Sequence, residues 1–85
     1  MARFRTAVHI TPRKGLLDPQ GQAVRDALRT LGFDGVKTVH VGRYIIVESD
    51  SVDAVSAEEE VSAMCAKLLA NPVTEDFEIE SAVSV

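Results

Sequence analysis

The residue types best suited to bind a metal in this sequence are two histidines and a run of carboxylates near the C-terminus. His9 and His40 fall on different predicted strands, whereas a histidine-based metal site needs ligands that converge. The carboxylate run consists of Glu75, Asp76, Glu78 and Glu80. Because neighbouring residues of a strand face opposite ways, the run spreads its carboxylates over two faces instead of clustering them. The sequence therefore predicts no metal ligands and no bound cofactor.

The single cysteine and one glycine-containing loop are the other places where chemistry could occur. Cys65 lies on the apolar side of a predicted helix, where a thiol packs as a small buried residue and lacks the electropositive surroundings of a catalytic thiolate. The loop Gly15–Gly21 precedes a helix beside Lys14, as a phosphate-binding loop would. It matches neither the Walker pattern nor G-x-G-x-x-G, and the carboxylate of Asp18 would repel an anion. With no Ser-His-Asp or Cys-His arrangement to assemble, we predict a chain without catalytic residues.

Length and composition describe one small domain. The chain has 85 residues, of which 46% are hydrophobic and 26% charged, and this suits a single globular domain over residues 1–85. A net charge of −4 disfavours a nucleic-acid-binding protein, which usually carries a basic face. One cysteine excludes an internal disulfide and a multi-cysteine metal site. No apolar stretch is long enough to span a membrane and no signal-peptide pattern is present, so we expect a cytoplasmic protein.

The first third of the chain predicts a strand followed by a helix. Apolar and polar residues alternate from Arg3 to Thr11, which indicates a strand with one buried face. Asp18 is well placed to cap the helix, because its carboxylate can accept the free amide hydrogens of the first turn. Proline at the first helical position and an apolar stripe predict a helix over Pro19–Leu31, which Gly32 ends.

The middle of the chain predicts a hairpin. Two strand-like runs, Val36–Val41 and Tyr44–Ser49, are joined by Gly42-Arg43, which is typical of a type II′ turn. The second run begins Tyr-Ile-Ile-Val and is apolar on both faces. The helices of this short chain can cover only one of those faces, so we expect a partner layer from another subunit on the other.

The last third predicts a second helix and a final strand. The helix covers about Ala57–Ala70, with Ser56 and Glu59 as a capping box. Thr74–Ser81 alternates acidic and apolar residues as an edge strand would, and Ser81–Val85 reads as a frayed tail. The order strand, helix, strand, strand, helix, strand predicts an α+β, ferredoxin-like two-layer sandwich. In this fold an antiparallel sheet carries two helices on one face, and we expect the protein to be oligomeric.

Three segments of the sequence resemble the small PurS-type subunit of phosphoribosylformylglycinamidine (FGAM) synthase. They are Thr11–Gly21, which contains L-L-D-P-Q-G, Val39–Tyr44, which contains V-G-R, and Lys67–Phe77, which contains L-A-N-P-V-T-E-D. The resemblance runs over essentially the whole chain in the same order. It implies a non-catalytic subunit of a ligase complex in de novo purine biosynthesis, with no activity in the isolated chain.

The resemblance also implies partners and cofactors. The complex would convert formylglycinamide ribonucleotide, glutamine and ATP into the amidine, glutamate, ADP and phosphate, with ATP and Mg²⁺ bound by its large synthetase subunit. This chain would bind no cofactor itself. It would bridge the synthetase and glutaminase subunits, support ammonia transfer between them, and form a homodimer or homotetramer.

Matched motif positions suggest which residues contact partners, although local roles explain several of them equally well. The candidates are Lys14, Asp18, Gln20, Gly21, Arg43, Asn71, Pro72, Glu75 and Asp76. Of these, Lys14, Arg43 and Glu75 are the preferred contacts, while capping accounts for Asp18 and helix termination for Asn71-Pro72. The main alternative function is a ferredoxin-like regulatory domain that binds a small metabolite. A nucleic-acid-binding domain is disfavoured, because the sheet lacks a basic and aromatic face.

Overall fold

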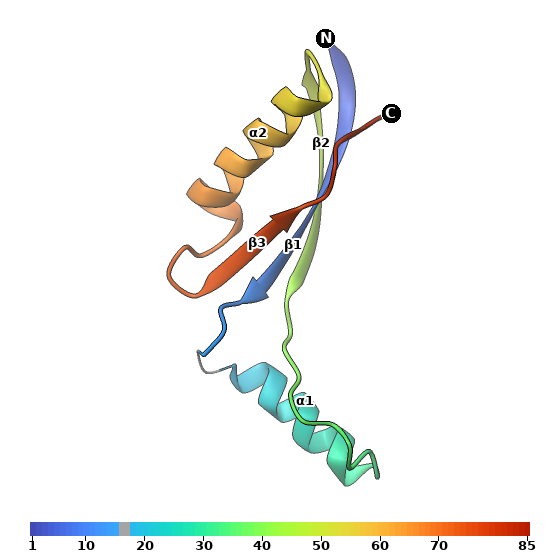
Figure 1. Cartoon of the computed structure of the whole chain (residues 1–85), viewed down its shortest axis with the longest axis vertical. Coiled ribbons are helices and arrows are strands. Elements are labelled where there is room, and N and C mark those ends of the chain that lie inside the picture. The colour runs from blue at the N-terminus through green and yellow to red at the C-terminus, as the bar shows by residue number, and fades with distance from the viewer. Residues whose placement is uncertain (16–17) are drawn as a thin grey trace.

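The computed structural model describes residues 1–15 and 18–85, so Leu16 and Leu17 of the first PurS-like segment lie outside the described residues. The elements are β1 (Ala2–Pro12), α1 (Pro19–Thr30), β2 (Arg43–Ser51), α2 (Ala54–Met64), a π-helical turn η1 (Cys65–Leu69), β3 (Glu75–Ile79) and β4 (Val83–Ser84). Figure 1 shows the sheet and α2 at one end of the molecule and α1 at the other.

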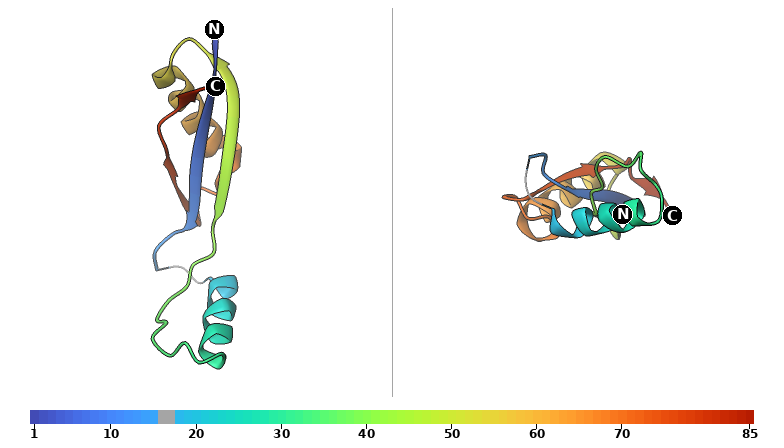
Figure 2. Two further views of the ribbon diagram at one scale, coloured as in Figure 1. Left: turned by 90° about the vertical axis from the view of Figure 1, so that its right-hand side faces the viewer. Right: turned by 90° about the horizontal axis from the view of Figure 1, so that it is seen from below.

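The strands form one antiparallel sheet with β1 in the middle. β2 pairs along one edge of β1, while β3 and then β4 pair along the other. Val8 at the centre of β1 lies opposite Ile45 of β2 and Ile79 of β3. The helix α2 covers one face of this sheet (Figure 2). Beneath it lies the core, which comprises Val8, Ile10, Val61, Cys65 and Ala70, with Phe4, Ala57 and Ala82 in a second cluster.

The helix α1 lies beyond the end of the sheet instead of on its face (Figures 1 and 2). The molecule is therefore elongated, with extents of 52 × 26 × 14 Å. Its radius of gyration is 16.4 Å, whereas a compact domain of this length has a radius of about 12 Å. None of the helices in the described part of the chain combines the length and the apolar character needed to cross a bilayer.

The predicted α+β class, with an antiparallel sheet and two helices, is confirmed. The expected arrangement differs in two respects within the single chain: only α2 covers the sheet, and Val36–Val41 is not a strand. The type II′ hairpin is also absent. A Cβ on Gly42 would lie 2.2 Å from the carbonyl oxygen of Ile10, so this glycine permits a close approach to the end of β1. The backbone continues past it into β2 without turning back.

Two smaller predictions were wrong for local reasons. The helix α2 begins at Ala54, because Asp53 accepts a hydrogen bond from the amide of Ser56 at 2.8 Å and caps the helix in place of the Ser56 capping box. That bond also lowers the pKa of the Asp53 carboxyl below its ordinary value. The C-terminal tail is paired instead of frayed: β4 joins the sheet, and the amide of Val85 donates to the carbonyl of Arg3 at 3.0 Å.

Candidate partner interface

Most of the motif residues gather where the sheet meets α1. We call this region the junction and define it as the end of β1 and the following loop, the start of β2, and the loop between η1 and β3. The motif residues in it are Arg13, Lys14, Arg43, Asn71, Pro72, Glu75 and Asp76, all polar except Pro72, and they come from three separate segments. The chain thus brings the first and third PurS-like segments together, although residues 22–66 separate them in the sequence.

The carboxylate of Glu75 is the centre of the junction. Its Oε1 atom accepts from Nη2 of Arg43 at 2.6 Å and from the backbone amide of Asn71 at 2.8 Å. The same Arg43 nitrogen donates to the carbonyl of Leu69 at 3.0 Å. Only 22% of the Glu75 side chain is exposed. These bonds hold the η1–β3 loop against the start of β2, so Arg43 and Glu75 stabilise the chain itself.

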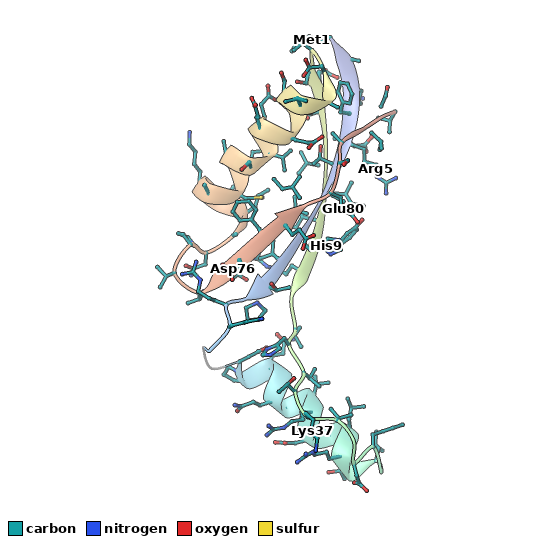
Figure 3. All side chains as sticks on the ribbon, in the orientation of Figure 1. Met1, Arg5, His9, Lys37, Asp76 and Glu80 are labelled. Atoms are coloured by element: carbon teal, nitrogen blue, oxygen red, sulfur yellow. The ribbon has the colours of Figure 1, made fainter. Side chains whose placement is uncertain are left out.

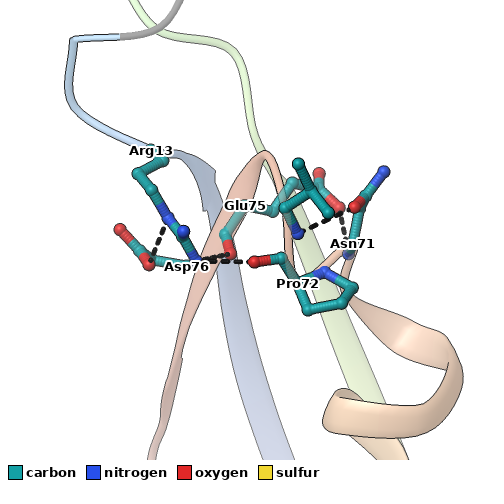
Figure 4. A network of polar contacts seen from close by, with 6 residues as sticks. Arg13, Asn71, Pro72, Glu75 and Asp76 are labelled. Atoms are coloured by element: carbon teal, nitrogen blue, oxygen red, sulfur yellow. Dashed lines mark hydrogen bonds and ion pairs between the residues drawn. The ribbon is translucent and has the colours of Figure 1, made fainter.

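A second arginine joins the same loop to β1 (Figure 4). Nη2 of Arg13 donates to the carbonyl of Pro72 at 2.7 Å, and its Nε lies 3.3 Å from Oδ1 of Asp76. The amide of Arg13 donates to the carbonyl of Thr74 at 2.8 Å. Sequence reasoning did not select Arg13. Its place in the first PurS-like segment, directly before Lys14, was the signal that could have found it.

Asp18 joins α1 to the segment that returns from it. Its Oδ1 accepts from the amide of Gly21 at 3.0 Å, which confirms the predicted cap, and its Oδ2 accepts from the amide of Val41 at 3.2 Å. Nδ1 of His40 lies 3.5 Å from the same Oδ2. With 10% of its side chain exposed, Asp18 is the most enclosed carboxylate in these ion pairs. The Gly21 amide is the main cause that lowers the pKa of this carboxyl below its ordinary value.

Gly21 is required by the same close packing. A Cβ at this position would lie 2.1 Å from the carbonyl oxygen of Val39. Beside it is a small open hollow of about 100 Å³, lined by Asp18, Gln22, Arg25, Thr38, Val39 and His40. Asp18 and Gly21, like Arg43 and Glu75, therefore have structural roles inside the chain.

Lys14 lies on the exposed part of the junction, and Gln20 is exposed in the first turn of α1. Lys14 lies on the rim of an open hollow of about 390 Å³, which is lined by Thr11, Pro12, Arg13, Lys14, His40 and Asp76. The cations of this rim stand beside the carboxylate of Asp76, so the surface is polar and mixed in charge. Such a surface suits a protein contact better than an enclosed ligand site.

The remaining groups with potential for chemistry are dispersed. His9 lies on the sheet face opposite α2 (Figure 3), where its Nε2 is 3.3 Å from Glu80 and its ring centroid is 4.7 Å from that of Tyr44. The pKa of Tyr44 is raised above its ordinary value, mainly because its hydroxyl is partly removed from water and also because it donates a hydrogen bond to Glu80. Cys65 is buried in the core, and burial raises the pKa of its thiol, as expected of an unreactive cysteine. Residues 1–15 and 18–85 contain no group of three histidine, cysteine or acidic side chains that could hold a metal.

Comparisons with known proteins agree with the resemblance seen in the motifs. Residues 5–83 match the family model described as PurS, phosphoribosylformylglycinamidine (FGAM) synthase. The chain is 40% identical over 77 residues to the FGAM synthase subunit PurS of Methanocaldococcus jannaschii, covering 91% of this chain and 93% of that protein. It is 41% identical over 76 residues to the PurS subunit of Mycobacterium leprae, covering 88% and 91%.

Solved structures show the same likeness in three dimensions. The crystal structure of M. jannaschii PurS superposes with a TM-score of 0.82 at 38% identity and covers 96% of this chain and 98% of that one. A chain of the PurLQS structure from Thermotoga maritima superposes with a TM-score of 0.86 at 31% identity and covers 95% and 99%. At these identities and coverages the likeness extends to the whole chain, α1 included.

Proposed function

The chain belongs to the PurS family of FGAM synthase subunits, and we propose that it bridges the synthetase and glutaminase subunits of this ligase. FGAM synthase acts in purine biosynthesis, and this chain is one of its non-catalytic subunits. In the proposed role the glutaminase releases ammonia, and the synthetase uses it to aminate formylglycinamide ribonucleotide with ATP and Mg²⁺. The bridge keeps the two subunits close enough for ammonia to pass. Such a complex would work in the cytoplasm.

The observation that carries this proposal is the match over nearly the whole chain to a family with a member in the PurLQS structure. The site geometry agrees with it. The buried thiol and the dispersed histidines offer no reacting group, whereas the junction presents a firmly held polar surface. A rigid surface of this kind loses little conformational entropy when a partner binds.

We propose a division of roles among the residues of the junction and the first turn of α1. Lys14 and Gln20 contact a partner subunit, together with the exposed Pro72 and Asp76. Arg43, Asn71 and Glu75 shape the loop that presents this surface, because the largely enclosed carboxylate of Glu75 binds both the Arg43 guanidinium and the Asn71 amide. We also propose that the protein forms a homodimer or homotetramer, since it exposes apolar side chains on both α1 and the sheet.

A reconstitution tests the bridging role. Purified synthetase and glutaminase subunits are assayed for amidine formation with and without this chain, first with glutamine and then with an ammonium salt as the nitrogen source. We expect glutamine-dependent turnover only when the chain is present, and ammonium-dependent turnover in both cases. Full glutamine-dependent activity without the chain would refute the proposal. A screen for metabolites that raise the melting temperature of the chain would then test the regulatory alternative.

A further inference from the structure

The outer edge of β3 carries backbone groups that point away from the sheet. The amide of Glu80, directly after the strand, donates to the carbonyl of Ala7 in β1 at 2.9 Å. Because the backbone groups of successive residues point to opposite edges of a strand, the amides and carbonyls of Phe77 and Ile79 point to the outer edge. In the part of the chain that the structure describes, no strand pairs with this edge (Figure 2). It therefore offers a row of donors and acceptors to an added strand.

An open hollow of about 410 Å³ lies beside this edge, between η1 and β3. It is lined by Arg13, Cys65, Ala66, Ala70, Pro72, Glu75, Asp76 and Phe77, most of which are apolar. The short side chains of Ala66 and Ala70 leave space in front of the Phe77 ring, which is 38% exposed. The hollow thus has room for an apolar side chain that reaches in from a neighbouring strand.

The other face of β3 is acidic. Ile79 packs against the core beneath α2, so the alternate residues Asp76, Glu78 and Glu80 face the opposite side, where all three are exposed. Asp76 pairs with Arg13 and Glu80 lies next to His9, whereas Glu78 has no ion pair among residues 1–15 and 18–85.

These carboxylates admit two explanations. Charges on an edge strand can serve only to prevent unwanted pairing. That role accounts for the acidic face, but it does not account for the apolar hollow on the other face of the same strand. A strand that pairs selectively with one partner accounts for both, because opposite charges on neighbouring strands attract while like charges repel.

The two faces together describe the strand that fits. Successive side chains of a strand point to opposite faces, so an added strand would place apolar residues towards the hollow and basic residues beside Glu78. The segment of this chain with such a pattern is Arg3–Thr11. It lies in β1, which is already paired along both edges, so a second copy of the chain does not supply the strand.

The hollow is continuous with the junction. Pro72 and Asp76 line it, and they are also two of the exposed residues assigned above to a partner contact. A partner subunit that binds the junction therefore reaches the outer edge of β3 without leaving the surface of the chain.

We propose that the outer edge of β3 binds an extended segment of the partner subunit that contacts the junction, and that apolar and basic residues alternate in this segment. The segment forms main-chain hydrogen bonds with Phe77 and Ile79, places an apolar side chain in the hollow and sets a basic side chain beside Glu78. This is recognition by strand addition, in which the backbone supplies affinity and the side chains supply specificity. The inference rests on the bridging function proposed above, and it adds the surface and the chemistry of the segment that binds there.

Photochemical cross-linking of the full-length chain tests the site. Phe77 is replaced by the photoreactive residue p-benzoylphenylalanine, and the variant is mixed with the synthetase and glutaminase subunits and irradiated. We expect a covalent adduct with one of these subunits, which mass spectrometry maps to a segment of alternating apolar and basic residues. The same replacement at Val55, which is 64% exposed on α2, should give no adduct.

A charge reversal tests the recognition. The dissociation constant of the fluorescently labelled chain from the cross-linked subunit is measured by anisotropy. It should rise about tenfold in Glu78→Lys, because the reversal places like charges opposite each other. Glu59→Lys makes the same change of charge at an exposed position of α2 and should leave the constant unchanged. Circular dichroism of both variants checks that they are folded.

Other outcomes would overturn the proposal. An adduct between two copies of this chain would mean that the edge is a contact between copies. An adduct at Val55 but none at Phe77 would place the partner elsewhere, and equal effects of the two charge reversals would show that Glu78 faces no basic residue. These experiments measure binding, whereas the reconstitution measures turnover. A mixture that uses glutamine normally but gives no adduct at Phe77 would refute the strand addition and leave the bridging role standing.

Discussion

Removing the Glu75 carboxylate tests whether the junction is held by its partly enclosed ion pair with Arg43. Glu75→Ala deletes two hydrogen bonds, from Arg43 at 2.6 Å and from the amide of Asn71 at 2.8 Å. Hydrogen bonds to charged groups contribute about 1.5–3 kcal/mol each, and water can replace part of this for the half-exposed arginine. We therefore expect a loss of about 2–3 kcal/mol in the free energy of unfolding. Arg43→Ala should cost less, about 1–2 kcal/mol, because the Asn71 bond remains.

The assay is urea unfolding followed by circular dichroism, at one fixed protein concentration because association adds to apparent stability. A double-mutant cycle over Glu75 and Arg43 should give a coupling of about 1–2 kcal/mol. The matched control is Arg3–Asp50 at the opposite end of the sheet, which is spaced at 3.2 Å and exposed on both sides. Its coupling should stay below about 0.5 kcal/mol. Equal couplings for the two pairs would refute the reasoning that enclosure and shared bonds make the Glu75 pair strong.

Three further predictions concern the start of α1 and the junction. Gly21→Ala should destabilise the chain by about 1–3 kcal/mol in the same unfolding assay despite the better helix propensity of alanine, because its Cβ would lie 2.1 Å from the Val39 carbonyl oxygen. The pKa of Asp18 is lowered in the folded chain, so its stabilising effect is complete above its unfolded pKa, near 3.9, and is lost as the pH falls through the lower folded value. Helical circular dichroism should accordingly drop below about pH 4, and the drop should be smaller in Asp18→Asn; an unchanged acid limb would contradict this. In the reconstituted complex, Lys14→Ala should raise several-fold the concentration of this chain needed for half-maximal glutamine-dependent turnover, because it removes one charge from the interface. Lys67→Ala, which changes another exposed lysine, on η1, should leave that concentration unchanged.

Local patterns in the sequence predicted most of the elements correctly. The alternation of Arg3–Thr11, the Asp18 cap and the apolar stripe of the first helix each depend on residues within a few positions of one another, and the structure contains the strand and the capped helix that they predicted. The same holds for the final strand. The matched motifs also indicated the PurS family from the sequence by itself.

What the sequence alone did not decide is how these elements meet. The tendency of Val36–Val41 to form a strand is local, but a strand exists only where another strand completes its hydrogen bonds, and within residues 1–15 and 18–85 no strand pairs with it. Likewise, Lys14, Arg43 and Glu75 were alike in sequence as charged motif positions. Only the folded chain showed that Arg43 and Glu75 bind each other across 32 residues while Lys14 remains exposed. The sequence determines the tendency of each segment to form a helix or a strand, and where the charged side chains stand along the chain. Which strands and which charged side chains pair depends on the tertiary structure, because only the fold brings distant groups within hydrogen-bonding distance.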